Sequence, residues 1–404
     1  MREFTLNAHF HDAVIHDGYM YFSETTFNGL FRVKEEGGEA EFLGRFPEED
    51  PWQGDLHRAL YLRENKIYFI PLNGRGISIY DIENNSFSMI WLVLNDNERA
   101  RYCQTIDIDA GILLIPSRLN VPFAIFHLDS EKIEFHREIN RRIMEKIAPS
   151  NEWEFFSAHG AIKDGDMLYL SVGDTNVVFS LSLKTWNVDM TILPMYARIR
   201  CMNKINDVFW FTLKEHSIIQ WNPTTGSCNK HTIPGKTKDL NYPYLLLLKH
   251  GDNLLLLAGR EDKIWEIDDK RIEWKDCTDY IDKSFQRDIQ GSLLFLGYHA
   301  DNESLILFPR SGNGVLKKKA SEDVFSFIPV KYDRVFVSEL RREWIKYLVK
   351  NNQLHFERDL ALEDFLEGVD DKDSGIYNLR TLCSDNGIKI YTEIMNENET
   401  IGDK

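Results

Sequence analysis

Five hydrogen-bonding side chains stand at matching positions, seven or eight residues ahead of successive turns in the chain: His11, His57, Gln104, His159 and Arg200. Alanine follows His11, His57 and His159 at the second residue. If the units that carry these residues repeat around one axis, the five side chains face a common pore, where crowding favours small neighbours. The two units that follow carry Leu245 and Phe295 instead, so the ring is expected to be polar on one arc only.

The three histidines can do chemistry. Neutral imidazole is a common ligand of late transition metals, and its pKa suits a general base near neutral pH. His11, His57 and His159 are therefore candidate catalytic residues and candidate ligands of a divalent metal, with His9, Asp12 and Asp55 as neighbours able to accept their protons. The alternative is that polar groups at a pore mouth only hold water and join neighbouring units, so that no cofactor is bound.

Basic side chains recur in the loops expected on the same face as the histidines: Arg75, Arg118, Lys214, Arg260 and Arg310. The planar guanidinium group matches a carboxylate or phosphate in a bidentate grip, and a concave surface concentrates the field of several such groups. Together with Gln104 and Arg200, these residues predict a site for an anionic ligand. In the alternative, each basic group pairs with an acidic neighbour such as Glu261.

Two tryptophans come shortly before histidines of this series. Trp52 precedes His57 by five residues, and Trp153 precedes His159 by six. Exposed aromatic rings stack on sugars or anchor a peptide or protein partner. Trp52 and Trp153 are therefore candidate ligand-binding residues, unless the packing of the core buries them.

These residues can meet only if the chain is built from repeated structural units, and the sequence shows such a repeat. Seven short apolar runs follow polar turns, at residues 19–22, 67–70, 112–115, 167–170, 208–211, 254–257 and 305–308, and each is followed by a second strand-like run. A third and a fourth run flank them, which gives four strands in each unit, and the units recur every 40 to 54 residues. This spacing is too irregular for a solenoid of constant pitch, but it is typical of propeller blades, whose loops vary in length.

The repeat resembles kelch and WD40-like propellers in plan, although their Trp-Asp and paired-glycine signatures are missing. We expect an all-β fold, a seven-bladed β-propeller of four-stranded blades. The blades are expected near 8–47, 55–95, 100–140, 155–195, 197–235, 242–278 and 290–331, inside a propeller of residues 1–335. Six or eight blades are alternatives, because the seventh unit is weakly patterned and residues 2–6 could supply a strand that closes the ring.

Two stretches break the β pattern. Residues 137–148 have apolar side chains at helical spacing and predict an inserted helix. Residues 338–350 and 360–369 predict helices in a C-terminal segment, 336–404, which either caps the ring or docks a partner.

Composition narrows the function. The net charge of −16 over 404 residues disfavours nucleic acid, no apolar run is long enough to cross a membrane, and the first residues lack the features of a secretory signal. Five scattered cysteines without a CxxC pair indicate neither a disulfide framework nor a zinc ribbon. We expect a cytoplasmic protein with no nucleic acid and no membrane among its partners.

Three functions are compatible with these features. The first is a non-enzymatic recognition propeller whose top face binds an anionic small molecule, acidic glycan or peptide, or a protein partner. The second is a metal-assisted lyase or hydrolase of an acidic saccharide, since the residue types at the expected pore mouth look similar to those of propeller lyases that act on oligogalacturonate. The third is a scaffold that docks a partner through its C-terminal helices.

Overall fold

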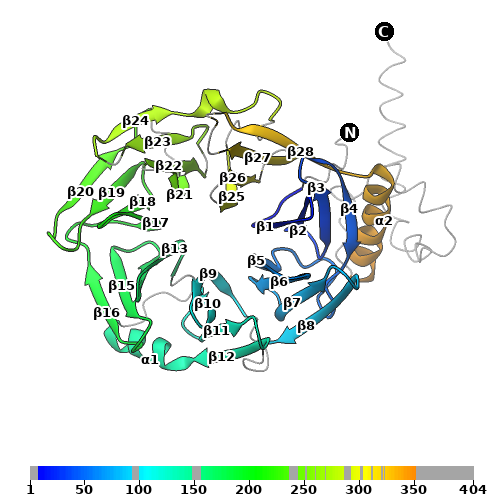
Figure 1. The fold of residues 1–404 in the computed structure, drawn as a ribbon, viewed down its shortest axis with the longest axis horizontal. Coiled ribbons are helices and arrows are strands. Elements are labelled where there is room, and N and C mark those ends of the chain that lie inside the picture. Colours follow the sequence, from blue (N-terminus) through cyan, green and yellow to red (C-terminus); the bar gives the residue numbers. More distant parts are fainter. Residues whose placement is uncertain are drawn as a thin grey trace, which may run out of the picture. The chain divides into compact units, whose positions relative to one another are not determined.

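Short antiparallel strands make up most of the chain between residues 13 and 332 in a computed structural model of the protein (Figure 1). The structure describes residues 8–92, 100–147, 156–235, 244–250, 253–259, 261–268, 270–285, 293–300, 304–310, 313–319, 322 and 324–351. Asn7–Lys331 form one compact unit, and the chain from Tyr332 onwards belongs to a second. Strand contacts are described below within the first unit.

The strands follow one another in runs of four, each strand pairing with the next. The first strands are β1 (Ala13–His16), β5 (His57–Arg63), β9 (Tyr102–Ile108), β13 (Phe156–Asp164), β17 (Ile199–Ile205), β21 (Tyr244–His250) and β25 (Phe295–Ala300). The second strands are β2 (Tyr19–Ser23), β6 (Lys66–Pro71), β10 (Gly111–Pro116), β14 (Met167–Val172), β18 (Val208–Leu213), β22 (Asn253–Ala258) and β26 (Ser304–Pro309).

The third strands are β3 (Leu30–Lys34), β7 (Gly76–Asp81), β11 (Phe123–His127), β15 (Val177–Ser182), β19 (Ser217–Trp221), β23 (Trp265–Asp268) and β27 (Gly314–Lys319). The fourth strands are β4 (Gly38–Gly44), β8 (Ser86–Trp91), β12 (Lys132–His136), β16 (Val188–Ile192), β20 (Cys228–Thr232), β24 (Glu273–Asp276) and β28 (Ser326–Tyr332). In Figure 1 the first strands lie innermost and the fourth strands outermost.

The sheets are arranged around a central axis, as in a β-propeller (Figure 1). Runs β5–β8, β9–β12 and β21–β24 are four-stranded sheets, whereas β13 adjoins β17 and β4 adjoins β28 to give two eight-stranded sheets. The β4–β28 contact joins the first run to the last. Residues 2–6, expected as a possible closing strand, lie outside the described residues.

The core lies between neighbouring sheets. Tyr68 and Ile79 of the second run, for example, pack in one buried cluster with Ile112 and Phe126 of the third. The second strands are mostly apolar, as in β10, because both of their faces are covered. Two-residue turns such as Asp17-Gly18, with φ of 48° and 76°, have the positive φ angles that tight hairpins need.

The inserted helix is α1 (Arg137–Lys146), which follows β12. It buries Ile139 and Ile143, and its Asn140 side chain hydrogen-bonds the backbone at Leu119, Val121 and Phe123. The second unit contains α2 (Arg334–Lys350), four residues longer at its start than the helix expected from 338. The helix expected over 360–369 lies outside the described residues. No helix in the described part of the chain is long and apolar enough to cross a bilayer.

Candidate functional site

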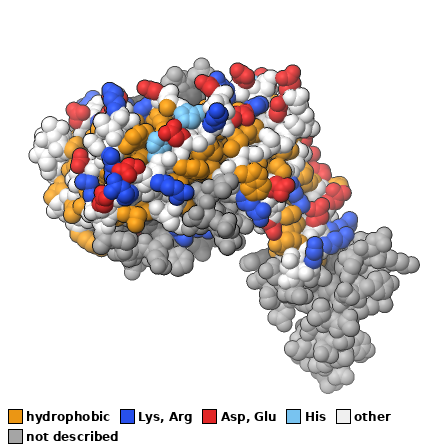
Figure 2. Space-filling model, turned by 90° about the horizontal axis from the view of Figure 1, so that it is seen from below, with side chains coloured by type: hydrophobic (Ala, Val, Ile, Leu, Met, Phe, Trp, Pro, Cys, Tyr) orange, Lys and Arg blue, Asp and Glu red, His pale blue; other side chains and the backbone are white. Residues whose placement is uncertain are grey.

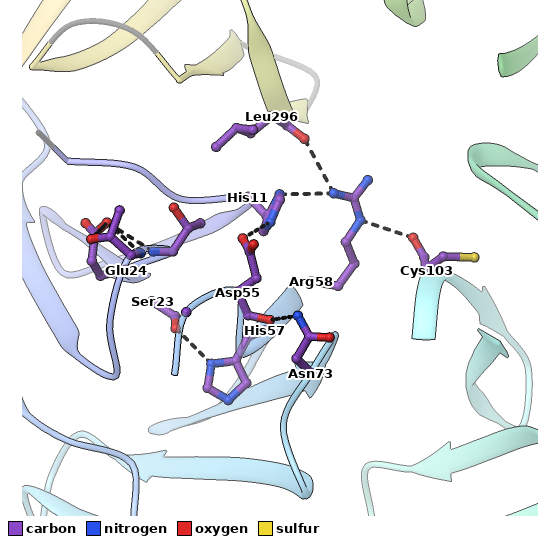
Figure 3. Close-up of polar contacts among 12 residues, drawn as sticks. His11, Ser23, Glu24, Asp55, His57, Arg58, Asn73, Cys103 and Leu296 are labelled. Carbon is purple, nitrogen blue, oxygen red and sulfur yellow. Dashed lines mark hydrogen bonds and ion pairs between the residues drawn. The ribbon is translucent and has the colours of Figure 1, made fainter. Parts of the chain in front are cut away.

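A partly buried arginine, Arg58, lies at the centre of the ring (Figure 3). Its Nε donates to the carbonyl oxygen of Cys103 at 3.1 Å, and its Nη1 donates to the carbonyl oxygen of Leu296 at 3.4 Å and to Nδ1 of His11 at 3.1 Å. Its Nη2 lies 3.0 Å and 2.6 Å from the two ring nitrogens of His159. One side chain therefore joins β5 to β9, β13, β25 and the segment ahead of β1.

A β-bulge turns Arg58 toward the axis. In β5, His57 is opposite Pro71 and Ala59 is opposite Ile70, so Arg58 is the extra residue of the bulge. A bulge of this kind redirects one side chain and bends the strand. Four other first strands have the same shift in register at the corresponding place, with one extra residue each: Cys103, Arg200, Leu245 and Leu296. With His11 and His159, these residues occupy corresponding places near the start of each run.

A consistent count in the sequence would have found this series. Counting back seven residues from the last residue of each turn between the first and second strands gives His11, Arg58, Cys103, His159, Arg200, Leu245 and Leu296. The expectation that His57, Gln104 and Phe295 occupy these places was wrong by one residue. The count for His57 was eight rather than seven, and the count for Gln104 started at Gly111, which already belongs to β10.

His57 does not meet the other two histidines. Its Nδ1 is hydrogen-bonded to Ser23 Oγ at 2.8 Å and its Nε2 to Ser78 Oγ at 3.2 Å, and its ring packs against Phe46 and Phe69. Figure 3 shows its ring turned away from Arg58. Burial lowers the pKa of His57 to about 3. The structure therefore places His57 between sheets, where it joins β2 and β7, and not at a common pore.

Gln104 also joins two runs. Its Nε2 donates to the carbonyl oxygen of Ala161 at 3.0 Å, which connects β9 to β13. Its Oε1 is buried and has no hydrogen-bond partner among the described residues.

His11 links Arg58 to a carboxylate. Because a guanidinium group can only donate, Nδ1 of His11 accepts from Arg58, and its Nε2 then carries the proton that it donates to Asp55 Oδ1 at 3.0 Å. Burial lowers the pKa of His11, although the hydrogen bond to Asp55 opposes that shift. The imidazole is therefore neutral, and both of its nitrogens are engaged.

Three arginines, Arg58, Arg200 and Arg310, act on the titratable groups near the start of the first strands, the end of the ring that we call the channel mouth. Burial lowers the pKa of His159 well below its ordinary value, and the charges of Arg58 and Arg200 lower it further. Burial, with the charge of Arg310, lowers the pKa of His9 to about 4. Burial alone would raise the pKa of Asp55, but its hydrogen bond to His11 and the charges of Arg310 and Arg58 outweigh that effect and lower it.

The basic loop residues lie at the end of the ring where the first strands begin. Arg75, Arg118, Lys214 and Arg310 each follow a second strand. Lys214 Nζ lies 3.9 Å from Asp174 Oδ2, and the backbone N–H of Arg75 donates to Glu49 Oε1. Arg310 is exposed and makes no ion pair among the described residues. Arg260 lies outside the described residues.

Trp52 is partly buried rather than exposed to solvent. Its ring lies 6.3 Å from that of Phe27, and the Arg45 guanidinium carbon is 5.5 Å from its centroid. Trp153 lies outside the described residues.

The described residues contain no group of three or more His, Cys, Asp or Glu side chains that could hold a metal ion. Among the histidines expected to bind one, His11 and His159 both contact Arg58, and the nitrogens of His57 contact serines. Figure 2 shows basic and acidic side chains interspersed on the face it presents.

Comparison with known proteins supports the fold. No family model matches the chain, and no curated protein matches it. Among solved structures, virginiamycin B lyase from Staphylococcus aureus is 13% identical with a TM-score of 0.53, and the match covers 75% of this chain and 94% of that one. A streptogramin B lyase is 14% identical with a TM-score of 0.52, and the match covers 76% of this chain and 94% of that one.

An extracellular domain of the putative one-component system BT4673 from B. thetaiotaomicron is 12% identical with a TM-score of 0.52. That match covers 77% of this chain and 38% of the other. At these identities the likeness shows a propeller-like fold and nothing about activity.

Proposed function

We propose that the chain is a recognition propeller that binds an anionic ligand at the channel mouth, where Arg58, Arg200 and Arg310 meet. The observation that carries this proposal is the combined effect of these three charges. They come from three different runs, and, beside the larger effects of burial and of the hydrogen bond from His11 to Asp55, their charges help to lower the pKa values of His9, Asp55 and His159. A carboxylate or phosphate group would be stabilised by the same field.

Each arginine has a separate part in this proposal. Arg58 forms the floor of the site. Its hydrogen bonds to His11, His159 and two carbonyl groups, from four other runs, hold its guanidinium group in place. Arg310 is exposed and is the group that reaches the ligand. Asp55, whose side chain is 51% exposed, orients His11 and excludes ligands with a second negative charge near it.

We also propose that the ring has seven blades of four strands each. The strand order supports this arrangement, because each of the two eight-stranded sheets consists of two complete runs of four. Their junctions are the single parallel bridge between His159 and Cys201 and the contact of β4 with β28.

Catalysis is the alternative for the same site. The His11–Asp55 pair favours acid–base chemistry, and two of the similar structures are lyases by name. However, both nitrogens of His11 are already hydrogen-bonded, so a substrate would have to displace Arg58 or Asp55 before His11 could accept a proton. Binding without catalysis needs no such rearrangement.

The test is a binding measurement with the full chain. Inorganic phosphate, glucuronate oligosaccharides and acidic peptides would be titrated calorimetrically, each beside an uncharged counterpart. We expect at least one anionic class to bind, and we expect Arg310→Ala to weaken it by about 10- to 100-fold, which corresponds to one charge-assisted hydrogen bond.

The matched control is Lys184→Ala, which removes the same charge from an exposed Lys184–Asp166 ion pair at the opposite end of the ring. Lys184→Ala should leave binding unchanged. If wild type and Arg310→Ala bind the anion equally well, the channel mouth is not the anion site. Release of an unsaturated product from polygalacturonate, abolished in His11→Gln, would instead favour the lyase.

A further inference from the structure

A large cavity lies at the other end of the channel. Its volume is about 870 Å3, within the range of small-molecule sites. Most of the residues that line it come later along the first strands than Arg58, His11 and Leu296. They include Leu60 and Tyr61 of β5, Asp107 of β9 and Tyr298 of β25. Because all first strands run in the same direction, this cavity faces away from the channel mouth.

The two lysines that line the cavity are neutralised locally. Lys317 Nζ lies 2.5 Å from Glu35 Oε1, and Lys319 Nζ lies 3.1 Å from Glu322 Oε1. The remaining carboxylates of the lining, Asp12 and Asp107, make no ion pair among the described residues. The uncancelled charge of the cavity is therefore negative, from Asp107 and, when it is ionised, from Asp12.

Asp12 is the deepest of these carboxyl groups. It is partly buried, and its oxygens accept hydrogen bonds from the backbone N–H groups of Ala13 at 2.9 Å and Leu60 at 2.8 Å. Burial raises the pKa of Asp12 to about 7, in spite of these bonds and the charge of Arg58. A cation in the cavity would stabilise the ionised carboxylate.

Two tyrosines complete the lining. Tyr61 donates its phenolic proton to Thr105 Oγ1 at 2.6 Å, which fixes its ring between β5 and β9. Tyr298 keeps 38% of its surface accessible although it belongs to a first strand near the axis. Aromatic faces beside carboxylates attract ammonium groups through cation–π contacts.

We propose that this cavity is a second binding site, and that it takes an organic cation with an ammonium group. Asp107 and Asp12 supply the negative charge, and Tyr61 and Tyr298 supply the aromatic surface. Lys317 and Lys319 are paired with Glu35 and Glu322, so they do not cancel that charge. The net charge of −16 would also draw cations to the protein. The site does not depend on the anion site at the mouth, since the two are built from different residues.

The experiment titrates the full chain with three probe cations, choline, spermidine and phenethylamine, by calorimetry at low salt. The uncharged isostere of choline, 3,3-dimethylbutan-1-ol, serves as the ligand control. We expect at least one of the cations to bind, and the isostere to bind at least tenfold more weakly than choline if choline is the ligand. Asp107→Asn should weaken the bound cation by about tenfold, and Tyr298→Leu should also weaken it.

Asp109→Asn is the matched control variant. Asp109 lies two residues beyond Asp107, is fully exposed and does not line the cavity, and the substitution removes the same charge. It should leave cation binding within twofold of wild type. The proposal is overturned if none of the three cations binds, if Asp109→Asn weakens binding as much as Asp107→Asn, or if the isostere binds as well as choline.

Discussion

At the scale of single residues, the three histidines expected at the pore act as hydrogen-bonding groups. His11 and His159 contact a guanidinium group that can only donate, and His57 contacts two serine hydroxyls. The residue types at the channel could be predicted from the sequence, since His11, His159 and Arg200 were identified. Arg58 was missed because a bulge, which depends on how two strands pair, decides which of two neighbouring side chains faces the axis.

His57 should make the protein sensitive to acid. The pKa of His57 is lowered from 6.5 to about 3 by burial, so the native ring stays neutral while the unfolded chain takes up a proton below about pH 6.5. The free energy of unfolding should therefore fall as the pH decreases from 6.5 toward 3, by about 1.4 kcal/mol per pH unit for this group.

Urea unfolding of wild type and His57→Gln between pH 7 and pH 4.5 checks this. The variant keeps a polar side chain but cannot take up the proton, so its stability should fall less steeply with decreasing pH. Parallel pH profiles for the two proteins would show that His57 is not buried as a neutral ring.

At the scale of elements, strand pairs and turns were accessible to sequence reasoning because each hairpin is local. Apolar second strands and turns such as Asp17-Gly18 have clear patterns. The contacts between runs have no such pattern. Gly297 of β25 is an example: a Cβ atom there would lie 1.9 Å from the carbonyl oxygen of His11, so the last run and the first approach closely at this glycine.

Gly297→Ala should therefore be strongly destabilising, because the atom in the way belongs to the backbone and cannot turn aside. We expect a loss of about 2 kcal/mol or more in urea unfolding, from overpacking at a rigid contact. Gly226→Ala is the control, since it introduces the same methyl group at φ +72° with nothing within 4 Å. That change should cost about 1 kcal/mol. Equal stability of Gly297→Ala and Gly226→Ala would contradict the close approach of Gly297 to the backbone of His11.

At the scale of the whole molecule, the ring brings together residues that are far apart in the chain. Arg58 contacts residues 11, 103, 159 and 296, which come from four other runs. The sequence predicts that such a centre exists once a propeller is inferred, but it cannot show that one arginine occupies it or that a cavity of about 870 Å3 lies beyond it. Both depend on how the runs pack around the axis.

The most direct test of this account is the stability of Arg58→Met beside Arg63→Met. Both substitutions remove one arginine from β5, but Arg63 lies at the far end of the strand, 40% exposed, in an ion pair with Asp129. Arg58→Met leaves two carbonyl groups and two imidazoles without their donor, and we expect it to lower the free energy of unfolding by about 3–5 kcal/mol, whereas Arg63→Met should lower it by at most about 1 kcal/mol. Equal stability of the two variants in urea unfolding would contradict a ring centred on Arg58.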